Sequence, residues 1–455
     1  MYMKKSLLGW TLQIANPKDA KQVFLKTDLF AKADMTVQKG TLRQDYLRSN
    51  NIVFANERLE WKKHRTVYNR IKSNRMIYIY IKKKYWKAFH RSMPIKLFAD
   101  LTNRSFTIID NHNDEPIDVS EIFDKLTLDV IGKAGFDYDF NATLCDKSDW
   151  LNTYRDIIVA SQEPIFFLFP FLEKKLLWLF TKRKQRHKLV TKMHTMLDKV
   201  IENKRQAIKN QDKKQNANDD REKDLLTLML ESESNGEGYL TNEELNSNLN
   251  IFFLAGADTT SNNIAFCLYF LAKNKDIQQR AREEAIKIFG DDPIDITPTP
   301  DQMKELTYIN QILKEVLRIS GPAVATTPRI VTQNTELSGV FIPKNTILEV
   351  AIYDIHHSKY VWKYPETFNP DRFTKDGEAE QKTREGLAWV PFASGSRMCI
   401  GMNFSLAEQR VMLLAFLRKY EWELPENSIH KEKLVTNNLF IIKPRDLYII
   451  FKRRY

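Results

Sequence analysis

The spacing of apolar residues is the feature that most constrains the fold of this chain. Apolar side chains recur at intervals of three and four over Glu121 to Val130, Leu189 to Lys204 and Gln302 to Arg318, which predicts amphipathic helices. Alternating, β-like runs are short and lie at the start, around 329 to 350, and at the end of the chain. We therefore expect a mainly α fold with a minor β-sheet.

The 455-residue chain is 43% hydrophobic and 28% charged, a composition typical of globular proteins and not of disordered or fibrous ones. Its length alone suggests about three domains. Lysine and arginine (70) exceed aspartate and glutamate (58), which gives a net charge of +12. The sequence shows no basic stripe interleaved with aromatic residues and no helix-turn-helix or zinc-finger spacing. The charge therefore favours a basic patch for an acidic partner over nucleic-acid binding.

Cysteine usage and the lengths of apolar runs argue against two classes of protein. Cys145, Cys267 and Cys399 are odd in number and widely separated, which disfavours a disulfide-stapled secreted protein and indicates a reducing compartment. Every apolar stretch is broken well short of the ~18 to 20 residues that cross a bilayer, so we expect no transmembrane span.

The first residues resemble a signal peptide, because two lysines precede an apolar stretch. Polar residues interrupt that stretch, and Trp10, Leu12 and Ile14 alternate with them, which favours a strand. Further along, residues 203–224 are almost entirely polar, which indicates a solvated helix end and a loop.

Aromatic and aliphatic residues are concentrated between Phe166 and Phe180, directly before the basic run Lys182 to Lys184. This aromatic segment is either part of the core or an apolar surface. Such a surface would touch a membrane or admit an apolar substrate, and the basic residues would face lipid headgroups. The sequence leaves both interpretations open.

A capping-box pattern at Thr241 and Glu244 predicts a helix that runs to Lys273. Ala255 to Thr260 interrupts it with glycine, aspartate and two threonines. These are poor helix formers, and threonine hydroxyls can bond back to the preceding turn, so we expect a local widening or kink. The interruption is either a packing accommodation or a ligand site at which an acid and an alcohol form a short proton relay.

The most informative motif is Phe392 to Gly401, FASGSRMCIG, which precedes a helical pattern from Met402 to Lys419. Its two glycines predict a tight loop whose amide groups point at the Cys399 sulfur beside a helix N-terminus, and both effects stabilise a thiolate. Cys399 is therefore either an inert buried thiol or a metal ligand. Zinc is disfavoured because no further cysteine or histidine lies at ligand spacing. A haem iron needs only this one protein ligand, because the porphyrin supplies four nitrogens.

This loop resembles the F-x-x-G-x-R-x-C-x-G motif of the cytochrome P450 family, the haem-thiolate monooxygenases. The matching residues are Phe392, Gly395, Arg397, Cys399 and Gly401. The resemblance covers essentially the whole chain and implies a single catalytic domain over residues 1–455. In that fold a helix-rich body holds haem b between the long central helix and the cysteine loop, with the Cys399 thiolate as the iron ligand.

Further motifs carry the same resemblance. Glu315 and Arg318 match the E-x-x-R helix, and Arg372 matches the segment that follows it, which implies a buried charge cluster that fixes the core around the cysteine loop. The family also implies side chains that hold the two carboxylates of haem, two of them on a W-x-x-x-R helix face. These side chains are Trp61, Arg65, Arg329 and Arg397.

The segment from Ala255 to Thr260 takes on a role under the same resemblance. Gly256 leaves room above the haem, while Asp258 and Thr259 resemble the acid and alcohol pair that delivers protons during oxygen activation. One atom of O2 then enters an apolar substrate and the other leaves as water.

The resemblance also implies partners and a location. No flavin- or nicotinamide-binding region occurs, so electrons are expected from NADPH-cytochrome P450 reductase, whose acidic surface would meet basic residues near the cysteine loop. The match is to the microsomal branch, which implies the cytosolic face of the endoplasmic reticulum membrane. That branch begins with an anchor helix and a proline-rich hinge. We therefore expect an N-terminally truncated sequence, the alternative being membrane contact through the aromatic segment.

Two other functions stay open at this point. A haem-thiolate isomerase, dehydratase or peroxygenase needs no reductase, although Asp258 and Thr259 argue against it. The second open function is non-catalytic: the protein would be a haem-binding relic or a redox-sensing thiol. Sterols, fatty acids, terpenoids and xenobiotics all suit the expected apolar pocket.

Overall fold

The computed structural model describes residues 1–6, 9–34, 40–48, 51–55, 58–69, 93–112, 114–145, 148–212, 224–234, 240–437 and 441–455. The chain divides into two compact units, each built from segments far apart in sequence. Unit 1 comprises residues 1–33, 93–127 and 258–455, and unit 2 comprises residues 34–92 and 128–257. Helices make up most of the described elements, which confirms the mainly α fold with a minor sheet.

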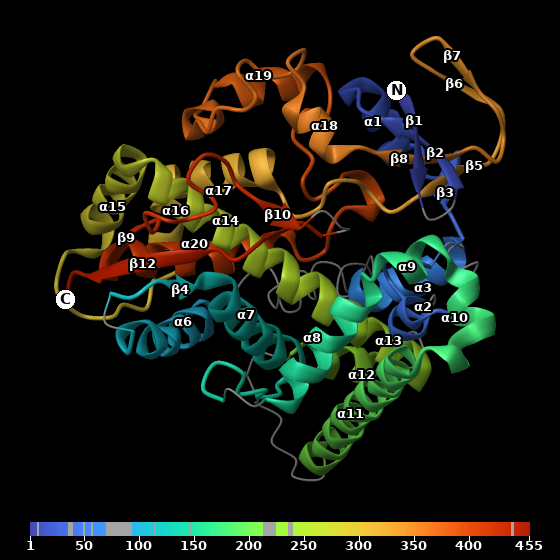
Figure 1. Ribbon diagram of the computed structural model, residues 1–455, viewed down its shortest axis with the longest axis horizontal. Helices are drawn as coiled ribbons and strands as arrows, with labels where there is room; N and C mark the ends of the chain where they lie inside the picture. Colours follow the sequence, from blue (N-terminus) through green and yellow to red (C-terminus); the bar gives the residue numbers. More distant parts are fainter. Residues whose placement is uncertain are drawn as a thin grey trace. The chain divides into compact units, whose positions relative to one another are not determined.

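The largest sheet of unit 1 joins strands from the first 32 residues to strands between residues 329 and 350, in the order β1-β2-β8-β5-β3 (Figure 1). Its strands are β1 (Tyr2–Ser6), β2 (Gly9–Ile14), β3 (Phe30–Lys32), β5 (Arg329–Val331) and β8 (Ile347–Val350). β1 and β2 form a hairpin, and β2 pairs in parallel with β8, with Leu12 opposite Leu348. The predicted strand at the start of the chain is confirmed as β2.

The remaining strands of unit 1 are short. They are β4 (Ile117–Asp118), β6 (Thr335–Leu337), β7 (Val340–Ile342), β9 (Tyr420–Glu423), β10 (Thr436–Asn437), β11 (Lys443–Pro444) and β12 (Tyr448–Arg453). β12 lies between β4 and β9 in a three-stranded sheet, and the others form the two-stranded pairs β6-β7 and β10-β11.

Helices supply most of unit 1. They are α1 (Pro17–Leu25), α6 (Ile95–Asp110), α14 (Thr259–Lys273), α15 (Lys275–Phe289), α16 (Gln302–Glu305), α17 (Thr307–Ser320), α18 (Ile352–His357), α19 (Glu378–Glu385) and α20 (Met402–Lys419), with the 3-10 turns η4 (Pro370–Phe373) and η5 (Gly395–Arg397). The predicted helix after the cysteine loop is confirmed as α20. The helix predicted over residues 302–318 is broken at Leu306. A new helix begins there because the Glu284 carboxylate of α15 accepts hydrogen bonds from the first three amide groups of α17.

All the named secondary-structure elements of unit 2 in the described residues are helices. Its helices are α2 (Leu42–Leu47), α3 (Arg58–Asn69), α8 (Asp149–Ser161), α9 (Pro164–Leu168), α10 (Pro170–Leu176), η2 (Leu177–Leu179), α11 (Thr181–Asp212), α12 (Leu225–Ser234) and α13 (Asn242–Phe252). α7 (Val119–Phe136) begins in unit 1 and ends in unit 2. α11 contains the helix predicted from residue 189 and extends into the polar stretch, of which residues 213–223 lie outside the described part.

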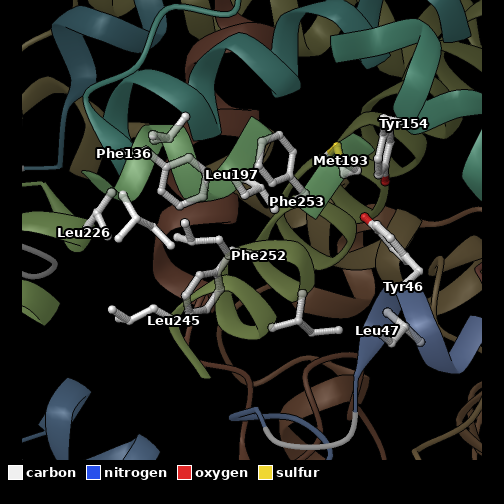
Figure 2. Close-up of a cluster of buried hydrophobic side chains, with 14 of the residues drawn as sticks. Tyr46, Leu47, Phe136, Tyr154, Met193, Leu197, Leu226, Leu245, Phe252 and Phe253 are labelled. Carbon is white, nitrogen blue, oxygen red and sulfur yellow. The ribbon is translucent and has the colours of Figure 1, made fainter. Parts of the chain in front are cut away.

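The core of unit 2 forms where α7, α8, α11, α12 and α13 bury their apolar faces (Figure 2). Phe253 lies at its centre, with ring centroids 5.4 Å from Phe136 and 5.1 Å from Phe140. Each fully buried side chain of this size contributes about 1.5–3 kcal/mol relative to an exposed one. The buried cluster therefore holds the end of α13 in place.

The helix predicted from Thr241 to Lys273 is three consecutive helical segments. The Glu244 amide donates to Thr241 Oγ1 (3.2 Å) and the Thr241 amide donates to the Glu244 carboxylate (2.8 Å), which confirms the capping box. α13 is followed by the π-helical turn η3 (Phe253–Asp258) and then by α14. The predicted widening is therefore confirmed, and the boundary between the two units falls within η3.

The aromatic segment forms α9, α10 and η2, and about half of its apolar side chains are exposed. Phe166 is buried beneath the Arg183 guanidinium, whose carbon lies 4.3 Å from the ring centroid. The exposed apolar residues, here called the apolar patch, are Ile165, Leu168, Phe169, Phe171, Trp178 and Leu179. The surface interpretation therefore applies to the apolar patch and the core interpretation to Phe166. Among the described residues, no helix combines the length and the apolar character needed to span a membrane.

Candidate active site

The loop from Phe392 to Gly401 presents Cys399 just before α20. The Cys399 amide donates to the Phe392 carbonyl (3.0 Å), which closes the loop. Gly395 has a φ of +71°, and a Cβ there would lie 2.6 Å from the carbonyl oxygen of Phe24 in α1. Only glycine permits both this backbone conformation and this close approach. The Cys399 side chain itself is exposed.

Three cations lie near one another beside this loop, all within unit 1. Arg329 is 2% exposed and donates Nη1 to the Phe30 carbonyl (3.0 Å), while its buried Nε has no hydrogen-bond partner among the described residues. Burial lowers the pKa of Arg329 to about 10. Burial also lowers the pKa of Lys32 well below its usual range, and the charges of Arg329 and Arg397 lower it further. Clustered cations with an unsatisfied donor fit an anionic ligand.

Glu315 and Arg318 of α17 form a buried ion cluster with Arg372 of η4. Arg318 donates Nε and Nη2 to the two carboxylate oxygens of Glu315 (2.7 and 2.9 Å), and Arg372 donates Nε to Glu315 (3.3 Å). Arg318 also donates Nη1 to the carbonyl of His356 (2.7 Å). The His356 ring accepts the Val390 amide at Nε2 (3.0 Å), so the cluster is connected to the chain that enters the cysteine loop. Burial lowers the pKa of His356 to about 3, which keeps the ring neutral.

Asp258 ends the π-helical turn and Thr259 begins α14. The next residue, Thr260, shares a hydrogen bond with Ser405 of α20, with 2.8 Å between the two hydroxyl oxygens. α14 is thus attached to the helix that follows Cys399. The predicted acid and alcohol and the predicted metal ligand therefore belong to one packed assembly within unit 1.

Trp61 and Arg65 lie four residues apart on α3 of unit 2, each partly buried. Between them, Lys63 Nζ donates to both carboxylate oxygens of Glu244 (2.8 and 2.7 Å), which attaches α3 to α13. Burial lowers the pKa of His64 to about 4, so its neutral ring can accept a hydrogen bond from an α13 asparagine. These contacts set the orientation of the helix that carries Trp61 and Arg65.

The predicted site residues thus divide between the two units. Unit 1 contains Asp258, Thr259, Glu315, Arg318, Arg329, Arg372, Phe392, Arg397, Cys399 and Gly401, whereas unit 2 contains Trp61, Arg65 and Gly256. A Cβ at Gly256 would lie 3.1 Å from Ile131 Cδ1, so this glycine permits close packing against α7. Lys32 and His356 were not predicted, because strand pairing and a helix from another part of the chain bring them to the site.

The donors present in unit 1 fit a haem. The exposed Cys399, in a glycine-closed loop, would be a suitable thiolate ligand for the iron, and buried cations with a guanidinium N–H that has no partner among the described residues would suit the carboxylates that haem carries. Among the described residues, no group of three or more histidine, cysteine or acidic side chains is arranged to hold a metal ion directly. A single thiolate combined with a porphyrin needs no such group.

Comparisons with known proteins agree with this chemistry. The family model described as Cytochrome P450 matches residues 10–451. Cytochrome P450 3A31 of Mesocricetus auratus is 27% identical over 403 residues, which are 80% of this chain and 74% of that protein. Cytochrome P450 4F8 of Homo sapiens is 27% identical over 90% of this chain and 75% of its own length. Desmethyl-deoxy-podophyllotoxin synthase of Sinopodophyllum hexandrum is 28% identical over 80% and 73%.

Proposed function

We propose, because this chain belongs to the cytochrome P450 family, that Cys399 supplies the thiolate that binds the iron of its haem b. The protein is a haem-thiolate monooxygenase that takes its electrons from a separate reductase. When bound, the haem activates O2 so that one oxygen atom enters the substrate and the other leaves as water. The observation that carries the choice of Cys399 is its exposed sulfur at the end of a loop that glycine keeps against α1.

The other two cysteines are poor candidates for the ligand. Cys267 is fully buried in α14, and burial raises the pKa of its thiol, which disfavours the thiolate. Cys145 is exposed, but it follows a turn of unit 2 and no glycine loop surrounds it. At Cys399, by contrast, the carbonyl of Phe392 closes the loop by accepting the Cys399 amide. Gly401 lies beside the sulfur, since a Cβ added there would be 3.9 Å from Sγ.

The carbon monoxide difference spectrum of the reduced protein tests this assignment. We expect the red-shifted Soret band of a thiolate-ligated haem in the wild type and its complete loss in Cys399→Ser. Cys145→Ser removes the other exposed cysteine and should leave the band unchanged. A Cys399→Ser protein that kept the band would refute the assignment.

We infer that the haem carboxylates are held by Arg329 and Arg397 and by Trp61 and Arg65. The unsatisfied Nε of Arg329 supports the first pair, and the shared helix face supports the second. Guanidinium groups bind carboxylates through charge-assisted hydrogen bonds that also fix orientation. On this proposal residues 1–455 form one catalytic domain.

The acid and alcohol at the start of α14 are proposed to move protons. Asp258 would take up a proton at its carboxylate and Thr259 would pass one on through Oγ1 to the face where O2 is reduced. The π-helical turn supports this role, because such turns leave backbone groups outside the regular ladder where a ligand can approach. Gly256 belongs to the same turn and keeps it close to Ile131.

The redox partner is proposed to be NADPH-cytochrome P450 reductase, with the basic surface of this chain facing an acidic one. The net charge of +12 supports such steering. The substrate is proposed to be apolar, a class that includes sterols, fatty acids, terpenoids and xenobiotics.

We also propose that the apolar patch rests on the cytosolic face of the endoplasmic reticulum membrane. Trp178 and Leu168 are 70% and 64% exposed, and unpartnered apolar area of this kind normally marks a binding surface. Lys174, Lys175 and Lys182 are exposed beside it, where they can face anionic headgroups.

Sedimentation with anionic phospholipid vesicles tests the membrane proposal. Replacing Phe171 and Trp178 by serine should weaken partitioning at least about tenfold, because two large apolar side chains lose their contact with lipid. Tyr360→Ser changes an exposed aromatic residue of unit 1 and should leave binding unchanged. Equal binding by the wild type and the double variant would rule out this surface.

A further inference from the structure

The edge strand β3 places Lys32 directly opposite Arg329 of β5 in an antiparallel pair. Residues opposite each other in such a pair project from the same face, with Cβ atoms about 4.5–5.5 Å apart, and like charges in this arrangement repel. The repulsion is unusual for a position at the edge of a sheet, where a charged side chain normally turns to solvent. Lys32 is instead partly buried.

A third cation acts on the same ammonium group. The charges of Arg329 and Arg397 both lower the pKa of Lys32, in addition to the larger effect of burial. Among the described residues, no carboxylate raises the pKa of Lys32 or of Arg329. Arg329 is almost completely buried, and in the part of the chain that the structure describes its Nε has no hydrogen-bond acceptor. An anion with at least two acceptor atoms would suit this cluster of donors.

We propose that Lys32 binds one carboxylate of the haem together with Arg329 and Arg397, as the third cation of a single anion site. This inference rests on the proposed function, because it assigns the anion to the cofactor of that site. Lys32 supplies a compact charge with three donors, and the guanidinium of Arg329 supplies a planar pair of donors, so together they can satisfy both carboxylate oxygens. The role of Lys32 is that of a positioning residue for the haem.

Three variants test the role of Lys32. Lys32→Met keeps the length and apolar stem of the side chain but removes the charge, Lys32→Arg keeps the charge, and Lys21→Met removes a charge from the exposed face of α1 as a matched control. We measure the rate at which haem leaves the holoprotein for an excess of a haem-scavenging apoprotein. Lys32→Met should lose haem about tenfold faster than the wild type, equivalent to ~1.4 kcal/mol. Lys32→Arg should recover most of the retention, and Lys21→Met should match the wild type.

Resonance Raman spectra of the same holoproteins separate haem binding from a merely structural role. The propionate bending band should shift in Lys32→Met and stay unchanged in Lys21→Met, because only the former alters a contact to the carboxylate. Wild-type haem loss in Lys32→Met, or faster loss with an unmoved band, would overturn this inference alone. A wild-type protein that retained no thiolate-ligated haem would overturn the proposed function together with it.

Discussion

Thr259 and Thr260 are neighbours in sequence with different expected roles. Thr260 shares its hydroxyl with Ser405 and so holds α14 to α20, while Thr259 is the proposed proton carrier. We therefore expect Thr259→Ala to keep consuming NADPH while the product formed per NADPH falls about tenfold or more, because proton delivery of this kind contributes about 10²–10⁴-fold. Parallel assays of NADPH oxidation and product formation measure this coupling.

Thr259→Ser provides the matched control, because it retains the hydroxyl and loses only a methyl group. It should couple NADPH consumption to product as the wild type does. Coupling in Thr259→Ala that equalled the wild type would show that the proton takes another route.

At the residue scale, the sequence predicts the role of a residue when that role depends on the local backbone conformation. The glycine at 395 could be recognised because a tight loop with positive φ favours glycine, a preference that belongs to the local backbone. Lys32 could not be recognised, because its role depends on pairing with a strand almost 300 positions away, and no local pattern encodes that partner. The same holds for His356, which acts through a single ring nitrogen on Val390.

At the scale of elements, the same distinction decides which helix boundaries could be predicted. The start of α13 was predictable because Thr241 and Glu244 cap it with their own side chains. The break at Leu306 was not, because the cap of α17 is the carboxylate of Glu284, which belongs to a different helix. Caps from outside an element leave no signature in the sequence of that element.

His187 of α11 connects α10, which carries part of the apolar patch, to α11 and α2 through hydrogen bonds. His187 donates Nε2 to Glu173 of α10 (2.7 Å) and Nδ1 to Asp45 of α2 (3.2 Å). Burial lowers the pKa of His187, but hydrogen bonds to these two carboxylates outweigh it and raise the pKa to about 9 from 6.5. A folded-state pKa above the unfolded value means that the charged ring stabilises the fold fully below about pH 6.5. This contribution is lost as pH rises through about 9.

We therefore expect His187→Gln to lower the free energy of unfolding by about 1–3 kcal/mol at about pH 6 and by much less at about pH 10. Denaturant titrations of variant and wild type at both pH values, followed by circular dichroism, measure the difference. His112→Gln, at an exposed histidine of unit 1, should show no difference that depends on pH in this way. A deficit of equal size at both pH values would contradict the proposed role of the imidazolium.

At the scale of the whole molecule, the excess of 70 basic over 58 acidic residues bears on the encounter with the reductase. Attraction between exposed charges is screened over about 10 Å at 0.1 M salt. We therefore expect the rate of reduction by NADPH-cytochrome P450 reductase to fall at least several-fold between about 20 mM and about 500 mM salt. Stopped-flow reduction under carbon monoxide measures this rate.

Turnover driven by an organic peroxide bypasses the reductase and serves as the control. It should change little over the same salt range, because no charged protein has to dock. A reduction rate insensitive to salt would remove the support for electrostatic docking.

Because unit 1 is built from segments far apart in sequence, strands that pair with each other are synthesised at different times. β2 completes its pairing only with β8, and the side chains of Gln13 and Glu349 that bond across this pair are 336 residues apart. A ribosome adding about 5–20 residues per second needs roughly 15–70 s to cover that distance. Throughout that interval β2 lacks β8 as a partner. Newly made chains should therefore depend on chaperones that shield exposed strand edges, and a slower rate of synthesis should prolong that dependence.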